Sequence, residues 1–182
     1  MAPYVTRREA LGGAAAALVL ASCGGGDPPP ATGPRPGSGI ALLGSLLALE
    51  RASVAAYGAC LEVLTGEART QMEAIRKEEQ AHADALEATI GHLGGTPPPG
   101  RPRAEYERTF PRLRTPEDAL RFAEDLEERH VRAYLEALTE FPALELRLQA
   151  AGICTDEANH LGAVRVLQGL PAAQGPFVTG AL

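Results

Sequence analysis

The stretches Glu79-Gln80-Ala81-His82 and Glu157-Ala158-Asn159-His160 decide the fold of this chain. Each contains a glutamate followed three residues later by a histidine, and each follows a single upstream glutamate, Glu50 in the first case and Glu127 in the second. The chain therefore carries one pattern twice, with an offset of 77 residues between the upstream glutamates and 78 between the Glu-x-x-His stretches.

The spacing within each copy indicates metal binding. Residues three apart lie on one face of a helix, so a glutamate and a histidine at this spacing can bind one ion together. One helix that donates a Glu, paired with one that donates Glu-x-x-His and used twice, is the ligand set of two-metal carboxylate sites in four-helix bundles. We predict six metal ligands: Glu50, Glu79, His82, Glu127, Glu157 and His160.

The positions of the turns agree with this prediction. The midpoint between the two glutamates of the first copy falls at residues 64–65, beside the expected turn Thr65-Gly66-Glu67, and Pro142 lies midway between those of the second. Residues equidistant from the turn of an antiparallel hairpin sit at the same height. Each hairpin is therefore expected to bring its three ligands to one level.

Hydrophobic periodicity and helix-end signals predict an all-α fold. Thr115 is a predicted N-cap, with Pro116 at the first helical position and Asp118 in the capping-box place. Between the second and third helices, residues 94–114 form one long crossover, which we expect Tyr106 and Phe110 to pin to the bundle. The expected helices span about 40–64, 67–93, 115–141 and 143–168.

The N-terminal residues predict export. Arg7-Arg8 precedes a short apolar run that ends in Leu20-Ala21-Ser22-Cys23, which resembles a twin-arginine signal with a lipobox. We expect residues 1–23 to be an export signal with lipidation at Cys23, 24–39 a Gly/Pro-rich tether, and 40–182 the bundle. The protein would then be a membrane lipoprotein facing outside the cytoplasm. A Sec-type signal with a chance arginine pair is the alternative.

The net charge of the chain restricts the partners that it can bind. The net charge of −6 argues against a nucleic-acid partner, which would need a basic face. Self-association as a homodimer is a further hypothesis.

In this topology Cys60 and Cys154 differ in height by roughly 20 Å, beyond the reach of a disulfide. We therefore predict two buried free thiols.

Further residues repeat around the predicted ligands. Tyr57 and Tyr134 follow the two upstream glutamates by seven residues. They either pack in the core with satisfied hydroxyls, or they donate a hydrogen bond to a ligand carboxylate or take a redox role near the metals. His130 forms a third Glu-x-x-His with Glu127, but its repeat counterpart is Ser53. It is therefore either an extra ligand or, as is more usual, a residue outside the ligand set.

The chain resembles the ferritin-like superfamily, close to exported bacterial ferritin-like domain proteins, which are related to rubrerythrin and manganese catalase bundles. The resemblance rests on the two Glu-x-x-His stretches, Gly94-Gly95-Thr96-Pro97, and Leu126-Glu127 with Ala133-Tyr134. It implies two iron or manganese ions on the six ligands. It also implies that Asp156, which precedes a ligand glutamate, orients a histidine, with Glu78 in the equivalent place.

This resemblance leads to three hypotheses for function. The first is an enzyme of ferroxidase, peroxidase or catalase type that acts on oxygen, peroxide or metal ions. The second is a protein that binds metal without turnover, and the third is a structural envelope lipoprotein with a vestigial site. No four-cysteine module of the rubredoxin type is present in the sequence, so an electron feed of the rubrerythrin kind is not expected.

Overall fold

The computed structural model describes residues 36–173 and 175. The chain divides into two units, 1–32 and 33–182, and the first lies outside the described residues. The predicted export signal, the lipidation site Cys23 and most of the predicted tether also lie outside them. Those features therefore stay predictions.

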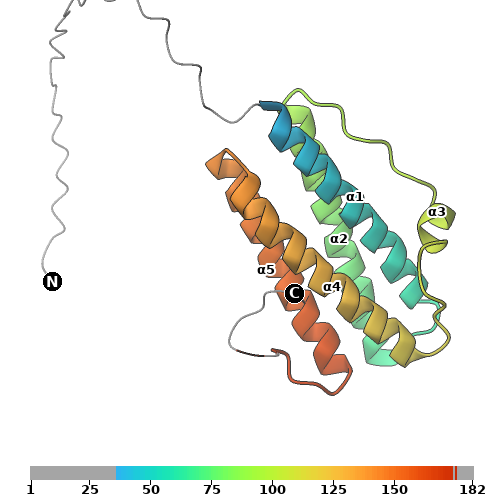
Figure 1. The fold of residues 1–182 in the computed structure, drawn as a ribbon. Coiled ribbons are helices and arrows are strands. Elements are labelled where there is room, and N and C mark those ends of the chain that lie inside the picture. The colour runs from blue at the N-terminus through green and yellow to red at the C-terminus, as the bar shows by residue number, and fades with distance from the viewer. Residues whose placement is uncertain (1–35, 174, 176–182) are drawn as a thin grey trace, which may run out of the picture. The chain divides into compact units, whose positions relative to one another are not determined.

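The described residues form five helices and no strand (Figure 1). Helices α1 and α2 form one antiparallel hairpin and α4 and α5 form the other, while the short α3 lies on the crossover between them (Figure 1). The prediction of an all-α bundle of two hairpins is confirmed. The helices are α1 (Pro36–Cys60), α2 (Gly66–His92), α3 (Arg103–Glu107), α4 (Pro116–Glu140) and α5 (Leu144–Leu167).

Three helices match their predicted bounds closely, and α1 differs at both ends. It begins at Pro36 rather than Ile40, so the last part of the predicted tether is helical. A proline is compatible with the first turn of a helix, where its missing N–H has no partner to lose. The helix ends at Cys60, and the residues up to Leu64 form turns rather than a further helical stretch.

The helix ends follow the local sequence. The predicted capping box of α4 is present, because Thr115 accepts from the backbone N–H of Asp118 and the Asp118 side chain accepts in return from that of Thr115. Gly66, at the start of α2, and Gly94, just after its end, both have positive φ angles, a conformation that favours glycine. These residues therefore set the tight first turn and the start of the crossover.

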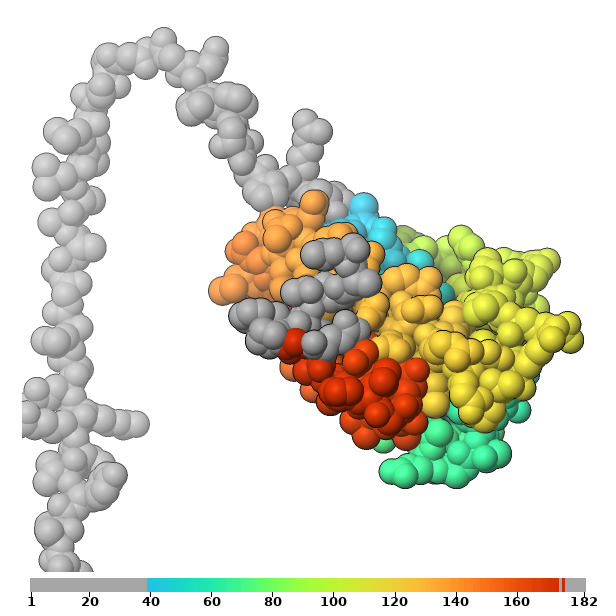
Figure 2. All heavy atoms as spheres, turned by 60° about the horizontal axis from the view of Figure 1, so that its bottom comes forward, coloured from blue at the N-terminus to red at the C-terminus, as the bar shows by residue number. Residues whose placement is uncertain are grey.

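The crossover runs along α1 and packs on the hairpins. Figure 2 shows its atoms, in yellow-green to yellow, beside those of α4. Phe110 packs against Phe122 of α4 with the rings tilted by 51° and their centroids 5.3 Å apart, and Arg103 of α3 forms an ion pair with Glu62 at 2.5 Å. Phe110 therefore attaches the crossover as predicted. The hydroxyl of Tyr106 accepts a hydrogen bond from within the crossover, from the backbone N–H of Arg101.

The core consists of two apolar clusters with a polar layer between them. The first cluster contains Leu43, Leu47 and Leu86 with Phe141 near the α4–α5 turn, and the second contains Met72 and Ile75 near the opposite end. Along every long helix a buried glutamate falls between residues of the two clusters. The apolar clusters therefore enclose a set of carboxylates from both sides.

The two described cysteines are free and buried, as predicted. Burial raises the pKa of the Cys60 thiol to about 12, and it also raises the pKa of Cys154. Both thiols therefore stay protonated and chemically inert under ordinary conditions.

Within the described residues, the stretch Gly39–Cys60 is long and apolar enough to span a membrane by length and composition. The core helix of a soluble bundle passes the same test, and this stretch is most of α1. Because it carries the fully buried Glu50 into the polar layer, we interpret it as a bundle helix.

Candidate metal centre

Each of the four long helices contributes one glutamate with no exposed surface. These are Glu50 from α1, Glu79 from α2, Glu127 from α4 and Glu157 from α5. We call them the four-carboxylate cluster. Their common level follows from the hairpin geometry, in which residues equidistant from a turn lie opposite each other.

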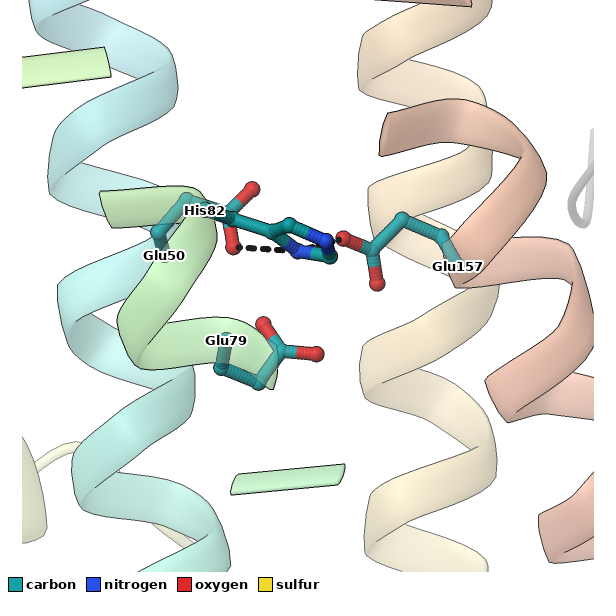
Figure 3. Close-up of side chains that lie close together, drawn as sticks. All are labelled: Glu50, Glu79, His82 and Glu157. Carbon is teal, nitrogen blue, oxygen red and sulfur yellow. Dashed lines mark ion pairs between the residues drawn. The ribbon is translucent and has the colours of Figure 1, made fainter. Parts of the chain in front are cut away.

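The first group of possible ligand atoms surrounds His82. Its Nδ1 lies 3.1 Å from Oε1 of Glu157 and 3.7 Å from Oε2 of Glu50. Figure 3 shows the ring between these two carboxylates, with Glu79 on the same helix below it. One donor atom from each of these four residues lies within 4.8 Å of the other three, close enough to hold one ion.

A second group of possible ligand atoms lies beside the first. It consists of Glu79, Glu127, His130 and Glu157, whose donor atoms again lie within 4.8 Å of one another. Glu79 and Glu157 belong to both groups, and we call them the shared carboxylates. Glu50 and Glu127 each belong to one group, and we call them the outer carboxylates. Two adjacent groups with two shared carboxylates form the arrangement that a pair of ions requires.

His160 also approaches the second group. Its Nδ1 lies 3.1 Å from Oε1 of Glu79, 3.3 Å from Oε2 of Glu157 and 3.8 Å from Oε2 of Glu127. Its ring stacks on that of His82, with centroids 6.0 Å apart. The structure thus brings all six predicted ligands into one cluster.

The two tyrosines bond the outer carboxylates across the hairpins. The hydroxyl of Tyr57 donates to Oε1 of Glu127, and that of Tyr134 donates to Oε1 of Glu50. Each tyrosine therefore contacts the glutamate of the opposite hairpin rather than the one seven residues before it. Because each bond uses one carboxylate oxygen, the other oxygen stays available to an ion.

Two surface acids contact the far nitrogens of the histidines, again across the hairpins. Oδ2 of Asp156 lies 3.4 Å from Nε2 of His82, and Oε2 of Glu78 lies 2.6 Å from Nε2 of His160. A carboxylate on the far nitrogen holds that proton in place and leaves Nδ1 free to bind metal. Both acids thus lie within reach of a histidine ring, and the resemblance implies that they orient it.

The sequence profile of the ferritin-like domain matches residues 39–170. The chain belongs to the ferritin-like domain family. A search among curated proteins finds no match.

Solved structures share the fold of this ferritin-like domain. A conserved hypothetical protein from Mycobacterium tuberculosis has a TM-score of 0.67 at 19% identity, with 74% of this chain and 99% of that chain covered. A ferritin-like, diiron-carboxylate protein from Bacillus anthracis has a TM-score of 0.61 at 24% identity, with 72% of this chain and 96% of that chain covered. A bacterioferritin-related protein from Bacteroides fragilis, described as a dodecameric thioferritin, has a TM-score of 0.65 at 18% identity, covering 74% and 86%. These likenesses establish the fold.

The buried polar atoms of this ferritin-like domain fit a metal pair. Among the described residues, eight buried side-chain atoms have no hydrogen-bond partner, and seven belong to the four-carboxylate cluster, His82 or His130. Each such atom costs about 1–3 kcal/mol when left unpaired. Both oxygens of Glu157 and one oxygen of each other cluster glutamate are among them. Carboxylate oxygen and imidazole nitrogen are ligands that suit iron and manganese.

The electrostatics show how the metal-free cluster would balance its charge. Burial raises the pKa of Glu79 to about 8 and that of Glu127 well above its usual value. Burial disfavours the cationic forms of His82, His130 and His160 and so lowers their pKa values. Neighbouring carboxylates, led by Glu157, have the larger combined effect. They raise the pKa to about 10 for His82 and His130 and to about 11 for His160. Those imidazoles hold the pKa of Glu157 below its usual range, although burial opposes the shift. Without metal, protons therefore take the place of the ions.

His130 is the residue whose surroundings the sequence did not reveal. It is fully buried, and its Nδ1 is among the seven unpartnered atoms of the cluster. The Glu127-x-x-His130 spacing indicated that His130 could be an extra ligand. The repeat argued against an extra ligand, because the counterpart of His130 in the first hairpin is Ser53.

Proposed function

We propose that this ferritin-like domain holds two iron or manganese ions in redox chemistry with oxygen, peroxide or metal ions. The unpartnered donor atoms of the buried cluster carry this proposal. Four carboxylates carry a formal charge of −4, which two divalent ions balance, whereas unpaired buried charges would cost several kcal/mol each.

The shared carboxylates Glu79 and Glu157 would contact both ions, and Glu50 and Glu127 one each. His82 and His160 would supply imidazole nitrogen. A bound pair of iron or manganese ions supplies two-electron redox chemistry. The tyrosines would keep the outer carboxylates in place, since burial, followed by the neighbouring Glu127, raises the pKa of Tyr57 well above its usual value and keeps its hydroxyl a donor.

The protein around the cluster would control access to it. Apolar clusters close the site toward both ends of the bundle. The partly exposed edge of the cluster lies between α2 and α5, where His82 and His160 retain 8% and 4% exposure and the side chains of Glu78 and Asp156 are more than half exposed. Cations and small oxidants would enter here, past two acids that attract positive charge.

Export belongs to the same proposal. The N-terminal Arg7-Arg8 pair and the lipobox ending at Cys23 support an exported lipoprotein tethered to the membrane and facing outside the cytoplasm. Because the twin-arginine route carries folded proteins, metal could enter the site before export. The second candidate function is metal binding without turnover in the same location.

Anaerobic loading of the full chain separates the two candidates. The protein would be loaded with Fe(II) or with Mn(II), and then mixed with oxygen or hydrogen peroxide while absorbance and oxidant consumption are followed. The redox proposal expects oxidant consumption well above that of the free ion, and consumption no faster than that of the free ion with a Glu79→Gln/Glu157→Gln variant. Metal-loaded protein that consumes neither oxidant would leave binding without turnover.

A further inference from the structure

The two hairpins differ at one position beside the metal centre. The repeat offset of 77 residues pairs Ser53 of α1 with His130 of α4, and the two side chains touch, with Oγ 2.7 Å from Nε2. Both residues are fully buried. An imidazole therefore stands in the second hairpin where the first has only a hydroxyl.

One arrangement of protons satisfies both contacts of Ser53. The serine hydroxyl donates its one proton to the backbone carbonyl of Leu49 at 3.3 Å, and its oxygen accepts from Nε2–H of His130 at 2.7 Å. In this arrangement the lone pair of neutral His130 lies on Nδ1, the atom that faces the carboxylates.

The surroundings of that nitrogen are those of a metal ligand. Nδ1 lies 3.3 Å from Oε2 of Glu157 and 3.7 Å from Oε2 of Glu79, the two shared carboxylates. Both carboxylates are within ion-pair distance, but neither approach has hydrogen-bond geometry, so this buried nitrogen has no hydrogen-bond partner. It also lies within 4.8 Å of the donor atom of Glu127.

We propose that His130 is a seventh ligand, which Ser53 holds in its Nε2–H form, and that it makes the two metal positions unequal. This inference rests on the proposed two-metal function. The position beside Glu50 would have one imidazole, from His82. The position beside Glu127 would have two, from His130 and His160. Imidazole favours the later first-row metals over manganese, so the second position binds such an ion first and more tightly.

The test is a titration of the full chain with Co(II), followed by visible absorption against a competing chelator. The key variant is His130→Ser, which gives the second hairpin the residue of the first. His92→Ser is the matched control, because His92 is exposed at the end of α2. Circular dichroism checks that each variant is folded.

We expect two resolved binding steps in the wild-type chain and in the control. In His130→Ser the tighter step should weaken by more than the roughly 10–100-fold that loss of an outer hydrogen-bond partner costs. The affinities of the two binding steps should then become more similar. Unchanged steps in a folded His130→Ser chain would overturn the inference.

A second variant keeps His130 in place. Ser53→Ala removes the acceptor of Nε2–H and should weaken the same step by about 10–100-fold. An unchanged step would count against the role of Ser53. This variant also keeps the inference testable if His130→Ser does not fold.

Proton NMR of the chain with one Co(II) provides a readout that a merely structural role would not change. A ligated imidazole gives an N–H signal shifted far outside the diamagnetic range, and that of His130 should exchange slowly because the ring is fully buried. The signal should be absent from His130→Ser. Its persistence there, or its absence from cobalt-loaded wild-type protein, would contradict ligation.

The outcomes separate this inference from the proposed function. A wild-type chain that binds no Co(II) would remove both. A chain that binds two Co(II) ions with equal affinity would leave the two-metal function standing and overturn only the inequality.

Discussion

The α1–α2 and α4–α5 hairpins present the same donors at the same level, but they are not equivalent. Each supplies two glutamates, a histidine, a tyrosine for the opposite hairpin and a surface acid for the opposite histidine. They differ at Ser53 and His130. A repeated scaffold thus forms a paired cluster of donors, and we propose that one changed residue makes its two halves unequal.

The largest expected effect distinguishes shared from outer carboxylates. Glu79→Gln or Glu157→Gln should each remove both ions, because these residues belong to both donor groups. Glu50→Gln or Glu127→Gln should each leave one ion per chain. Metal analysis of the folded, desalted proteins measures this directly. If Glu79→Gln retained one ion while Glu50→Gln lost both, the division into shared and outer carboxylates would be wrong.

Metal loading should release protons from both halves. The pKa values are about 10 for His82 and His130 and about 11 for His160, so all three imidazoles are cationic at pH 7 in the metal-free chain. The pKa of Glu79 is about 8, so this carboxyl is mostly protonated at the same pH. Ligands bind metal only after deprotonation, so affinity should fall as pH falls. A pH-indicator titration should detect about three or more protons released per ion pair. Loading without proton release would contradict these assignments.

The surface acids offer a smaller and unequal effect. Glu78→Gln should weaken the ion beside His160 by about 10–100-fold, because Glu78 bonds that ring at 2.6 Å. Asp156→Asn should weaken the ion beside His82 by less, since its contact is 3.4 Å. Both are measured by competitive metal titration, with Asp84→Asn as an exposed control on α2. Equal effects of all three variants would show that only surface charge matters.

The sequence predicted the fold because its signals were local and repeated. The capping box at Thr115 and the turns at Gly66 and Pro142 placed the helices and the six ligands at one level. The short helix α3 was missed because its five residues lie in a Pro- and Arg-rich crossover.

The sequence alone could not predict contacts between the hairpins. Tyr57 shares a helix face with Glu50, but α1 and α4 run antiparallel, which brings its hydroxyl to Glu127. The proton position on His130 likewise depends on Ser53 of another helix. Such pairs depend on tertiary packing rather than on spacing along one helix.

The smallest effects should come from the tyrosines and should be equal in the two hairpins. Tyr57→Phe and Tyr134→Phe each leave a buried carboxylate oxygen without its donor, at a cost of about 1–3 kcal/mol. The free energy of unfolding of metal-free protein, from urea denaturation with chelator present, measures this loss. Tyr106→Phe is the control, since its hydroxyl meets only a long surface contact of 3.4 Å. A loss of unfolding free energy in only one of the two variants would show that the two tyrosine bonds are not equivalent.

Anomalous X-ray scattering from crystals of the metal-loaded full chain would show directly whether the four-carboxylate cluster holds two ions. We expect two peaks at the iron or manganese edge, about 3.5–4 Å apart as in known two-metal sites. Both should lie between Glu79 and Glu157, one next to His82 and the other next to His160. A single peak on the surface, or no peak within the four-carboxylate cluster, would contradict a two-metal centre.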